Sequence, residues 1–179
     1  VAPLASEIAK RFESQHPGIK IDVQSGGSGR GITDARQGLA NIGMVSRALK
    51  SDEQDLKAHT IGLDGISIIV NSSNPVKSLS SEQVVAVYSG RIKNWKEVGG
   101  QDLPITVVNK AEGRSTLELF THYFKLTNSQ IKAHIIIGDN QQRIKTVAGN
   151  RGAKGYETIG SAEFEQQQGT HIKLLPTEG

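Results

Sequence analysis

The sequence predicts an α/β protein with two lobes, in which helices flank mixed sheets. Only 4% of the residues are aromatic and 20 are glycine, a composition that suits tight turns between strands and helices better than an all-β sandwich. Short apolar segments with strand-like alternation are interleaved with segments of helical periodicity. Two loops of similar chemistry each join a strand-like segment to a helical one, which predicts one ligand held between two lobes.

Length and charge exclude several classes of protein. The 179 residues are enough to bury a core. The formal net charge of +3 comes without a basic run or aromatic-interleaved basic stripe, so we expect no nucleic-acid partner. The chain has no cysteine, which excludes disulfides and thiolate metal sites. Because no segment approaches the roughly twenty apolar residues of a membrane span, we expect a soluble chain whose export signal, or signal peptide, is absent.

The first third of the chain reads as a helix followed by a β-loop-α-β unit. Leu4, Ile8 and Phe12 recur at helical spacing behind Pro3, and a His-Pro-Gly sequence then ends the helix. Alternating apolar residues predict a strand that leads into the first loop. The other elements expected here are strands at 19–23 and 42–45 and helices at 31–39 and 51–58.

The rest of the chain alternates strands and helices. Ile66, Ile68 and Val70 alternate as a strand at the first crossing between the lobes, and Ser80 or Ser81 caps the next helix. The further expected strands are 105–108, 135–137, 155–159 and 172–175, and the further expected helices are 117–124, 141–147 and, as helix or loop, 161–168.

The expected lobes are discontinuous in sequence. Lobe 1 comprises residues 1–68 and 159–179, and lobe 2 comprises residues 69–158 with the crossover strands.

Two loops carry the candidate chemistry. The first loop, Ser25–Gly31, and the second loop, Asn109–Thr116, each offer backbone N–H groups, hydroxyls and cations at the start of a helix. The start of a helix carries about half a positive elementary charge and suits an anion. Together these donors favour a small oxyanion such as phosphate or sulfate.

Two nucleotide-binding patterns do not fit the first loop. A Walker A loop needs Lys and then Ser or Thr after its last glycine, but Gly31 is followed by Ile32 and Thr33. A dinucleotide fingerprint counted from Gly27 would place its third glycine at Ile32, and no ribose-binding acid is evident near Arg47.

A family resemblance runs through nearly the whole chain. The motifs are VAPL at 1–4, GGSGRG at 26–31, IGMVSR at 42–47, DG at 64–65, YSG at 88–90 with NW at 94–95, EGRST at 112–116, and GA at 152–153 with GY at 155–156. In order and spacing, they resemble phosphate-binding proteins of the PstS type, the periplasmic or surface receptors of phosphate ABC importers.

The resemblance implies a type II periplasmic-binding-protein fold, with two α/β lobes that close on the ligand by a hinge. It implies that the protein binds inorganic phosphate and delivers it to the membrane permease of an ABC transporter. We accordingly expect a bacterial periplasmic or extracellular-surface location, no cofactor, no enzymatic activity and a monomer. Relatives extend beyond both ends of this sequence, so we expect a fold truncated at both ends.

The resemblance also implies a set of phosphate ligands. They come from the first loop, from the end of the following strand, and from the start of the helix after the second loop. Carried over to this sequence, they are Ser28, Gly29, Ser46, Arg47, Glu112, Gly113, Arg114, Ser115 and Thr116.

Three positions depart from the family pattern. Many relatives have an acid at the position of Arg47, where it accepts a proton from hydrogenphosphate and rejects sulfate; Glu112 is the candidate to take over that role. Lys110 stands where better-known members have arginine, and it is read, like Arg30, as a surface charge. Lys154 stands where relatives tend to have an apolar residue.

Alternatives remain open at this point. The first is a receptor for sulfate or another tetrahedral oxyanion, and the second is a regulatory or interaction domain with a degenerate anion site. An enzyme such as a phosphatase comes third, because no nucleophile elbow is present. The five histidines show no metal-ligand spacing, so no metal site is expected. Asp64 and Asp139 are read as turn or cap residues.

Overall fold

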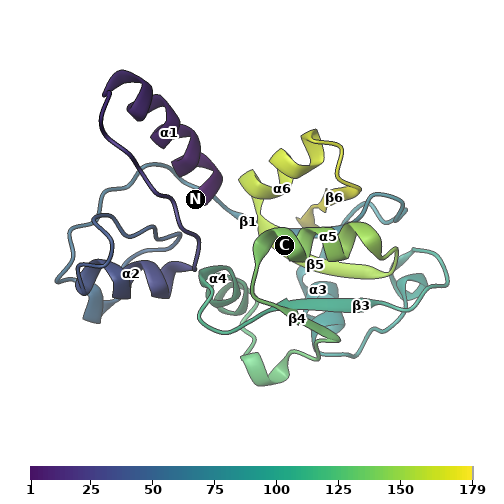
Figure 1. Ribbon diagram of the computed structural model, residues 1–179. Coiled ribbons are helices and arrows are strands. Elements are labelled where there is room, and N and C mark those ends of the chain that lie inside the picture. Colours follow the sequence, from purple (N-terminus) through teal and green to yellow (C-terminus); the bar gives the residue numbers. More distant parts are fainter. Residues whose placement is uncertain (179) are drawn as a thin grey trace. The chain divides into compact units, whose positions relative to one another are not determined.

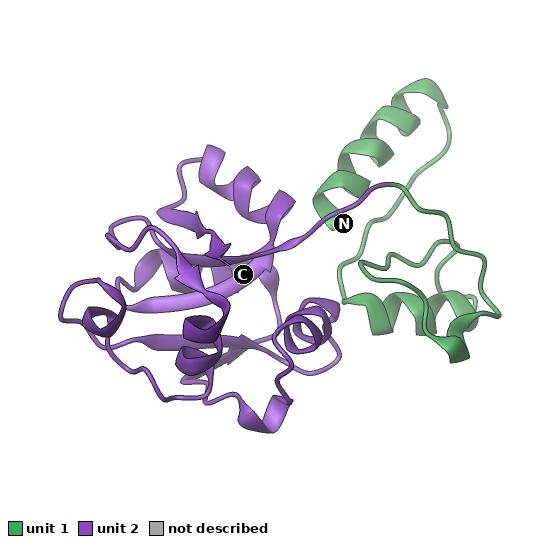
Figure 2. Ribbon diagram, turned by 180° about the vertical axis from the view of Figure 1, so that it is seen from behind, with its two compact units in different colours: residues 1–61 green, residues 62–179 purple. Residues whose placement is uncertain are grey.

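The computed structural model describes residues 1–178, which form two compact units. Unit 1 is Val1–Ile61, and unit 2 begins at Gly62 and contains the rest of the described chain (Figure 2). The predicted α/β class with mixed sheets is confirmed, and the sheets lie in unit 2.

Unit 1 contains helix α1 (Ala2–Gln15), helix α2 (Ser28–Arg36) and the short 3-10 helix η1 (Ser51–Glu53) (Figure 1). The predicted strands at 19–23 and 42–45 were wrong, since none of the described residues of unit 1 is in a strand. A strand needs a second strand to complete its hydrogen bonds. The side chains of Ile19 and Ile42 are 45% and 84% exposed, so the apolar alternation here does not mark a buried sheet face. Only the 3-10 turn forms within the predicted helix at 51–58.

Helix α2 begins three residues earlier than predicted, at Ser28, directly after Gly27 with its positive φ of 88°. Two glycines hold this helix against the segment that follows it. A Cβ atom on Gly31 would lie 2.5 Å from the Met44 carbonyl oxygen, and one on Gly43 would lie 2.3 Å from the Gly31 carbonyl oxygen. Close backbone approach therefore requires glycine on both sides.

Unit 2 is built on a five-stranded mixed sheet with the strand order β4-β3-β5-β1-β6. Strand β3 runs parallel to β4 and β5, whereas β1 runs antiparallel to β5 and β6. The strands are β1 (Ile66–Asn71), β3 (Thr106–Lys110), β4 (Ile135–Ile137), β5 (Ala153–Thr158) and β6 (Ile172–Leu175).

Helices cover both faces of this sheet. Ile68 and Val70 of β1 point to the face covered by α3 (Ser81–Tyr88) and α4 (Ser115–Tyr123). Ile69 points to the opposite face, which is covered by α5 (Asn140–Gly149) and α6 (Ile159–Gln167) (Figure 1). This alternation is the two-residue period of a strand that is buried on both sides.

Short elements complete unit 2. Strand β2 (Leu79–Ser80) pairs in parallel with β7 (Thr177–Glu178), and 3-10 helices lie at η2 (Trp95–Val98) and η3 (Asn128–Gln130). Ser80 caps α3 as predicted, because its hydroxyl accepts a hydrogen bond from the Gln83 N–H at 3.1 Å. None of the described helices combines the length and apolar character that a membrane span needs.

The compact units divide the chain differently from the predicted lobes. Residues 159–178 group with unit 2 and not with residues 1–61, because β6 pairs with β1 and Ala162 of α6 packs into the same core as Ile69. The division into functional lobes at residues 68 and 159 stays a prediction.

Candidate anion-binding site

In unit 1, the fold brings together two of the predicted ligands, Ser28 and Ser46. Ser28 is the first residue of α2 and is only 3% exposed. Its hydroxyl accepts a hydrogen bond from the backbone N–H of Ser46 at 3.1 Å, and the two hydroxyl oxygens lie 3.4 Å apart. The pair therefore sits at the positive end of a nine-residue helix.

Arg47, also a predicted ligand, is engaged by a carboxylate of unit 1. Its two terminal nitrogens donate to both oxygens of Glu53, at 2.7 and 2.8 Å, and both side chains are less than 10% exposed. The Arg47 hydrogen bonds, together with the Lys50 backbone N–H, lower the pKa of Glu53 to about 2. The positive charge of Arg47 is thus balanced, and a role as ligand stays a prediction.

In unit 2, the second loop leads from the end of β3 into α4. Gly113 has a positive φ of 80°, which turns the chain toward the helix. Ser115 and Thr116 form the first turn of α4 and are 5% and 3% exposed. The Thr116 hydroxyl has no hydrogen-bond partner among the described residues. A buried hydroxyl without a partner at a helix start is a donor that the oxygen of a bound anion would satisfy.

Two charged residues of the second loop differ in their surroundings. The Arg114 guanidinium lies beside Gly138, and no carboxylate among the described residues is within ion-pair distance of it. Glu112 is exposed, and its Oε1 atom accepts a hydrogen bond from the Asn128 side chain at 2.6 Å. Arg114 therefore supplies a cation, and the acceptor role of Glu112 stays a prediction.

Lys110, the last residue of β3, is not the surface charge that was predicted. Its side chain is 3% exposed and its Nζ atom lies 3.7 Å from Glu157 of β5. Lys110 also donates to the Asn140 side chain, and Arg143 of α5 pairs with the other oxygen of Glu157. Burial and the Arg143 and Arg114 guanidinium groups lower the pKa of Lys110 to about 7, while Glu157 acts in the opposite direction.

The buried groups behind the second loop carry more positive than negative charge. Lys110 and Arg143 are the buried cations there, and they share the buried carboxylate of Glu157. An anion at the start of α4 would offset that excess.

The sequence predicted the second loop but not the buried ion pair behind it. Residues 112–114 lie in the loop, and Ser115 and Thr116 begin α4 two residues before the predicted start at 117. Arg143 and Glu157 are not among the predicted ligands. They come from a helix and a strand that follow the loop, and no motif marks them. Asp139 caps α5 as expected, since its side chain accepts a hydrogen bond from the Gln142 N–H at 2.9 Å.

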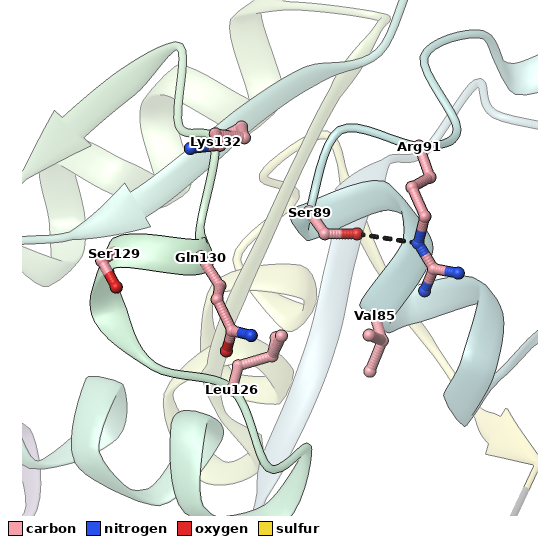
Figure 3. Close-up of a pocket in the computed structure, with 7 residues that line it drawn as sticks. All are labelled: Val85, Ser89, Arg91, Leu126, Ser129, Gln130 and Lys132. Carbon is pink, nitrogen blue, oxygen red and sulfur yellow. Dashed lines mark hydrogen bonds between the residues drawn. The ribbon is translucent and has the colours of Figure 1, made fainter.

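A separate hollow of about 460 Å³ lies elsewhere on unit 2 and contains none of the predicted ligands. Figure 3 shows Ser129 and Lys132 on the opposite side of this hollow from Arg91, and their polar ends do not converge. No group of acidic or histidine side chains among the described residues could hold a metal ion.

Comparisons with known proteins identify the family of this chain. A family model described as a PBP superfamily domain matches residues 1–173. The phosphate-binding protein PstS of Bacillus subtilis is 33% identical over 159 residues, which cover 86% of this chain and 52% of that protein. The chain thus spans about half the length of this curated relative.

Two solved structures are similar along nearly the whole chain. One, from Clostridium perfringens, is described as a phosphate ABC transporter substrate-binding protein with bound phosphate. It has a TM-score of 0.88 and 33% sequence identity, and the match covers 99% of this chain and 72% of the Clostridium chain. The other, an ABC-type phosphate transport receptor from Vibrio cholerae, has a TM-score of 0.68 and 31% identity and covers 98% and 72%. These matches confirm the predicted type II fold class, and the chain belongs to the PBP superfamily.

Proposed function

We propose that this chain binds inorganic phosphate as the substrate-binding part of a phosphate ABC importer. The observation that carries the proposal is the start of α4, where the buried Thr116 hydroxyl has no partner among the described residues. The cations Lys110 and Arg114 belong to the same loop. Hydroxyls, helix N–H groups and cations are the donors that a phosphate group needs.

The similarity to phosphate-binding proteins supports the choice of anion. The Bacillus relative is named a phosphate-binding protein, and the Clostridium structure contains phosphate. Ser28 and Ser46 of unit 1 are proposed as further ligands, with Gly29, Arg47, Glu112, Gly113 and Ser115. The proposal includes hinge closure, by which both loops contact one anion. It also includes a location outside the cytoplasmic membrane, a monomeric state, and no chemical change to the ligand.

Sulfate is the competing ligand. Lysine and arginine can only donate hydrogen bonds, so they do not separate hydrogenphosphate from sulfate. Discrimination requires an acceptor for the phosphate proton, and Glu112 is the proposed acceptor. Its contact with Asn128 leaves a second carboxylate oxygen for that role.

Calorimetric titration of the purified chain with phosphate tests the proposal. Thr116→Val removes the hydroxyl with little change in shape, and we expect it to weaken phosphate binding by roughly tenfold or more, as for a hydrogen bond to a charged group. Thr121→Val is the matched control on the same helix, because the Thr121 hydroxyl is bonded to the helix backbone at Leu117. Equal affinity of all three proteins would contradict the role of Thr116, and absence of binding by the unaltered chain would contradict the function.

A further inference from the structure

Lys110 is a buried amine with an incomplete counter-charge. It ends β3 at the entrance of the second loop and is 3% exposed. Its Nζ atom contacts Asn140 of α5 and lies 3.7 Å from Glu157 of β5. Asn140 is neutral, so Glu157 is the one carboxylate within ion-pair distance of this amine among the described residues.

Glu157 is shared with a stronger partner. Its Oε2 atom accepts a hydrogen bond from Arg143, which is fully buried. Its Oε1 atom accepts the Thr158 backbone N–H at 3.0 Å, besides lying near Lys110. An arginine keeps its charge at all accessible pH values, whereas a buried lysine can lose its proton. The negative charge of Glu157 is therefore balanced mainly by Arg143 and only in part by Lys110.

The charged groups around Lys110 act in opposite directions. Arg143 of α5 and Arg114 of the second loop repel a charged ammonium, and Glu157 of β5 attracts it. With burial as the largest cause, the balance lowers the pKa of Lys110 to about 7. A substantial fraction of Lys110 is then neutral in the anion-free protein near neutral pH.

Arg114, a proposed ligand, lies beside Gly138, and the Lys110 amine contacts Asn140, two residues further along the chain. A negative charge within about 4–6 Å of an amine favours its protonated form, so an anion held by Arg114 would shift this balance. Resting on the proposed function, we infer that Lys110 takes up a proton as the anion binds, and that Glu157 is the residue that positions its amine. The neutral –NH2 group becomes –NH3⁺. The proton comes from solvent when hydrogenphosphate binds, and from the ligand itself when dihydrogenphosphate binds.

Calorimetry in two buffers of different ionisation enthalpy measures the protons taken up per phosphate bound. Phosphate itself titrates near neutral pH, so the contribution of Lys110 is obtained as the difference from Lys110→Arg, which keeps a cation that does not titrate. At pH 7–7.5 we expect the unaltered chain to take up roughly half a proton more than Lys110→Arg. Lys173→Arg is the matched control and should give the same proton uptake as the unaltered chain. Lys173 lies on β6, outside the second loop, and donates a hydrogen bond to the Val76 carbonyl oxygen.

A second measurement decides the inference even if Lys110→Arg binds poorly. The ¹³Cε signal of Lys110, assigned by its absence in Lys110→Arg, is titrated with pH in the unaltered chain. Its midpoint should lie near neutral without phosphate and rise by about one pH unit or more with phosphate. Glu157→Gln should lower the midpoint of the anion-free protein, since it removes the group that favours the charged form.

The outcomes separate the two proposals. Phosphate binding with equal proton uptake in the unaltered chain and Lys110→Arg, and with an unmoved Lys110 midpoint, would overturn the inference and leave the proposed function standing. No binding of phosphate by the unaltered chain would overturn the proposed function and this inference with it.

Discussion

Arg143 and Glu157 form an ion pair in the layer between α5 and β5, with both side chains fully excluded from solvent. Removing one partner of such a pair leaves an uncompensated buried charge, at a cost of about 3–5 kcal/mol. We therefore expect Glu157→Gln to lose about that much stability. Denaturant unfolding followed by Trp95, the only tryptophan and a buried residue of unit 2, measures it. The double variant R143L/E157L should lose less than Glu157→Gln, and an equal or greater loss would contradict this account.

Lys154 is a further buried amine of unit 2. It is fully buried, its Nζ atom has no hydrogen-bond partner among the described residues, and it lies 4.7 Å from the centre of the Tyr88 ring. Burial holds the pKa of Lys154 well below its usual value. An unsatisfied buried polar group costs about 1–3 kcal/mol, so Lys154→Met should stabilise unit 2 by about that amount at pH 7. Lys145→Met, on the exposed face of α5, is the control and should change stability little; destabilisation by Lys154→Met would show that the amine has a favourable role.

The stability of unit 2 should rise with pH in the alkaline range, in phosphate-free buffer. The pKa of Lys110 is lowered from 10.5 to about 7, so between these values the unfolded chain binds more protons than the folded one. Stability then increases with pH through this window, by up to about 1.4 kcal/mol per pH unit. The Trp95 transition at pH 7, 8 and 9 measures the slope, and Lys110→Met should reduce it. Lys154, whose pKa is also lowered by burial, contributes to the slope that remains. If Lys110→Met and the unaltered chain have the same slope, other titrating groups cause the pH dependence and the prediction for Lys110 is wrong.

Unit 1 should lose stability in acid through Glu53. The folded-state pKa of about 2 lies below the usual 4.5, so the contribution of Glu53 is present above pH 4.5 and is lost as pH falls toward 2. The methyl signals of Ile32, a buried residue of unit 1, follow its unfolding by NMR between pH 6 and 2. Glu53→Gln should be less stable than the unaltered chain at pH 6 and should approach it at pH 2. A constant difference across this range would contradict the assignment.

Gly31 should tolerate no side chain. A Cβ atom there would meet the Met44 carbonyl oxygen at 2.5 Å, so Gly31→Ala should destabilise unit 1 by about 1–3 kcal/mol, as overpacking does. Displacement of α2 should also separate Ser28 from Ser46 and weaken phosphate binding. Gly62→Ala is the control, because no atom lies within 4 Å of its added Cβ. The Ile32 signals report stability, and equal stability of Gly31→Ala and the control would refute the close approach.

The sequence predicted those helices and strands whose spacing of apolar residues matches the face that they bury. Strand β1 was found from Ile66, Ile68 and Val70, and α3 from its apolar face and the Ser80 cap. The alternating apolar residues at 19–23 predicted a strand that does not form. Alternation indicates a preference for extended backbone, but a strand also needs a neighbouring strand to pair with. The start of α2 was placed too late because the glycines at 29 and 31 were read as loop, although both adopt helical conformation.

In the candidate site, too, local motifs were predictable from the sequence, whereas contacts between distant elements were not. Ser115 and Thr116 were predicted because the family motif is contiguous in sequence. The Arg143–Glu157 pair could not be predicted, because periodicity does not show which face of α5 meets which face of β5. Lys154 was marked as unusual, but its position over Tyr88 depends on packing between elements far apart in sequence.

The central claim is that this chain binds phosphate in preference to sulfate, and thermal unfolding with each anion tests it most directly. A ligand that binds only the folded state stabilises it by about 2.7 kcal/mol at one hundred times its Kd, which corresponds to a rise in Tm of roughly 5–10 °C. We predict such a rise with millimolar phosphate and a clearly smaller one with sulfate. Equal rises would contradict selectivity and indicate a general oxyanion receptor, and no rise with either anion would contradict the proposed function.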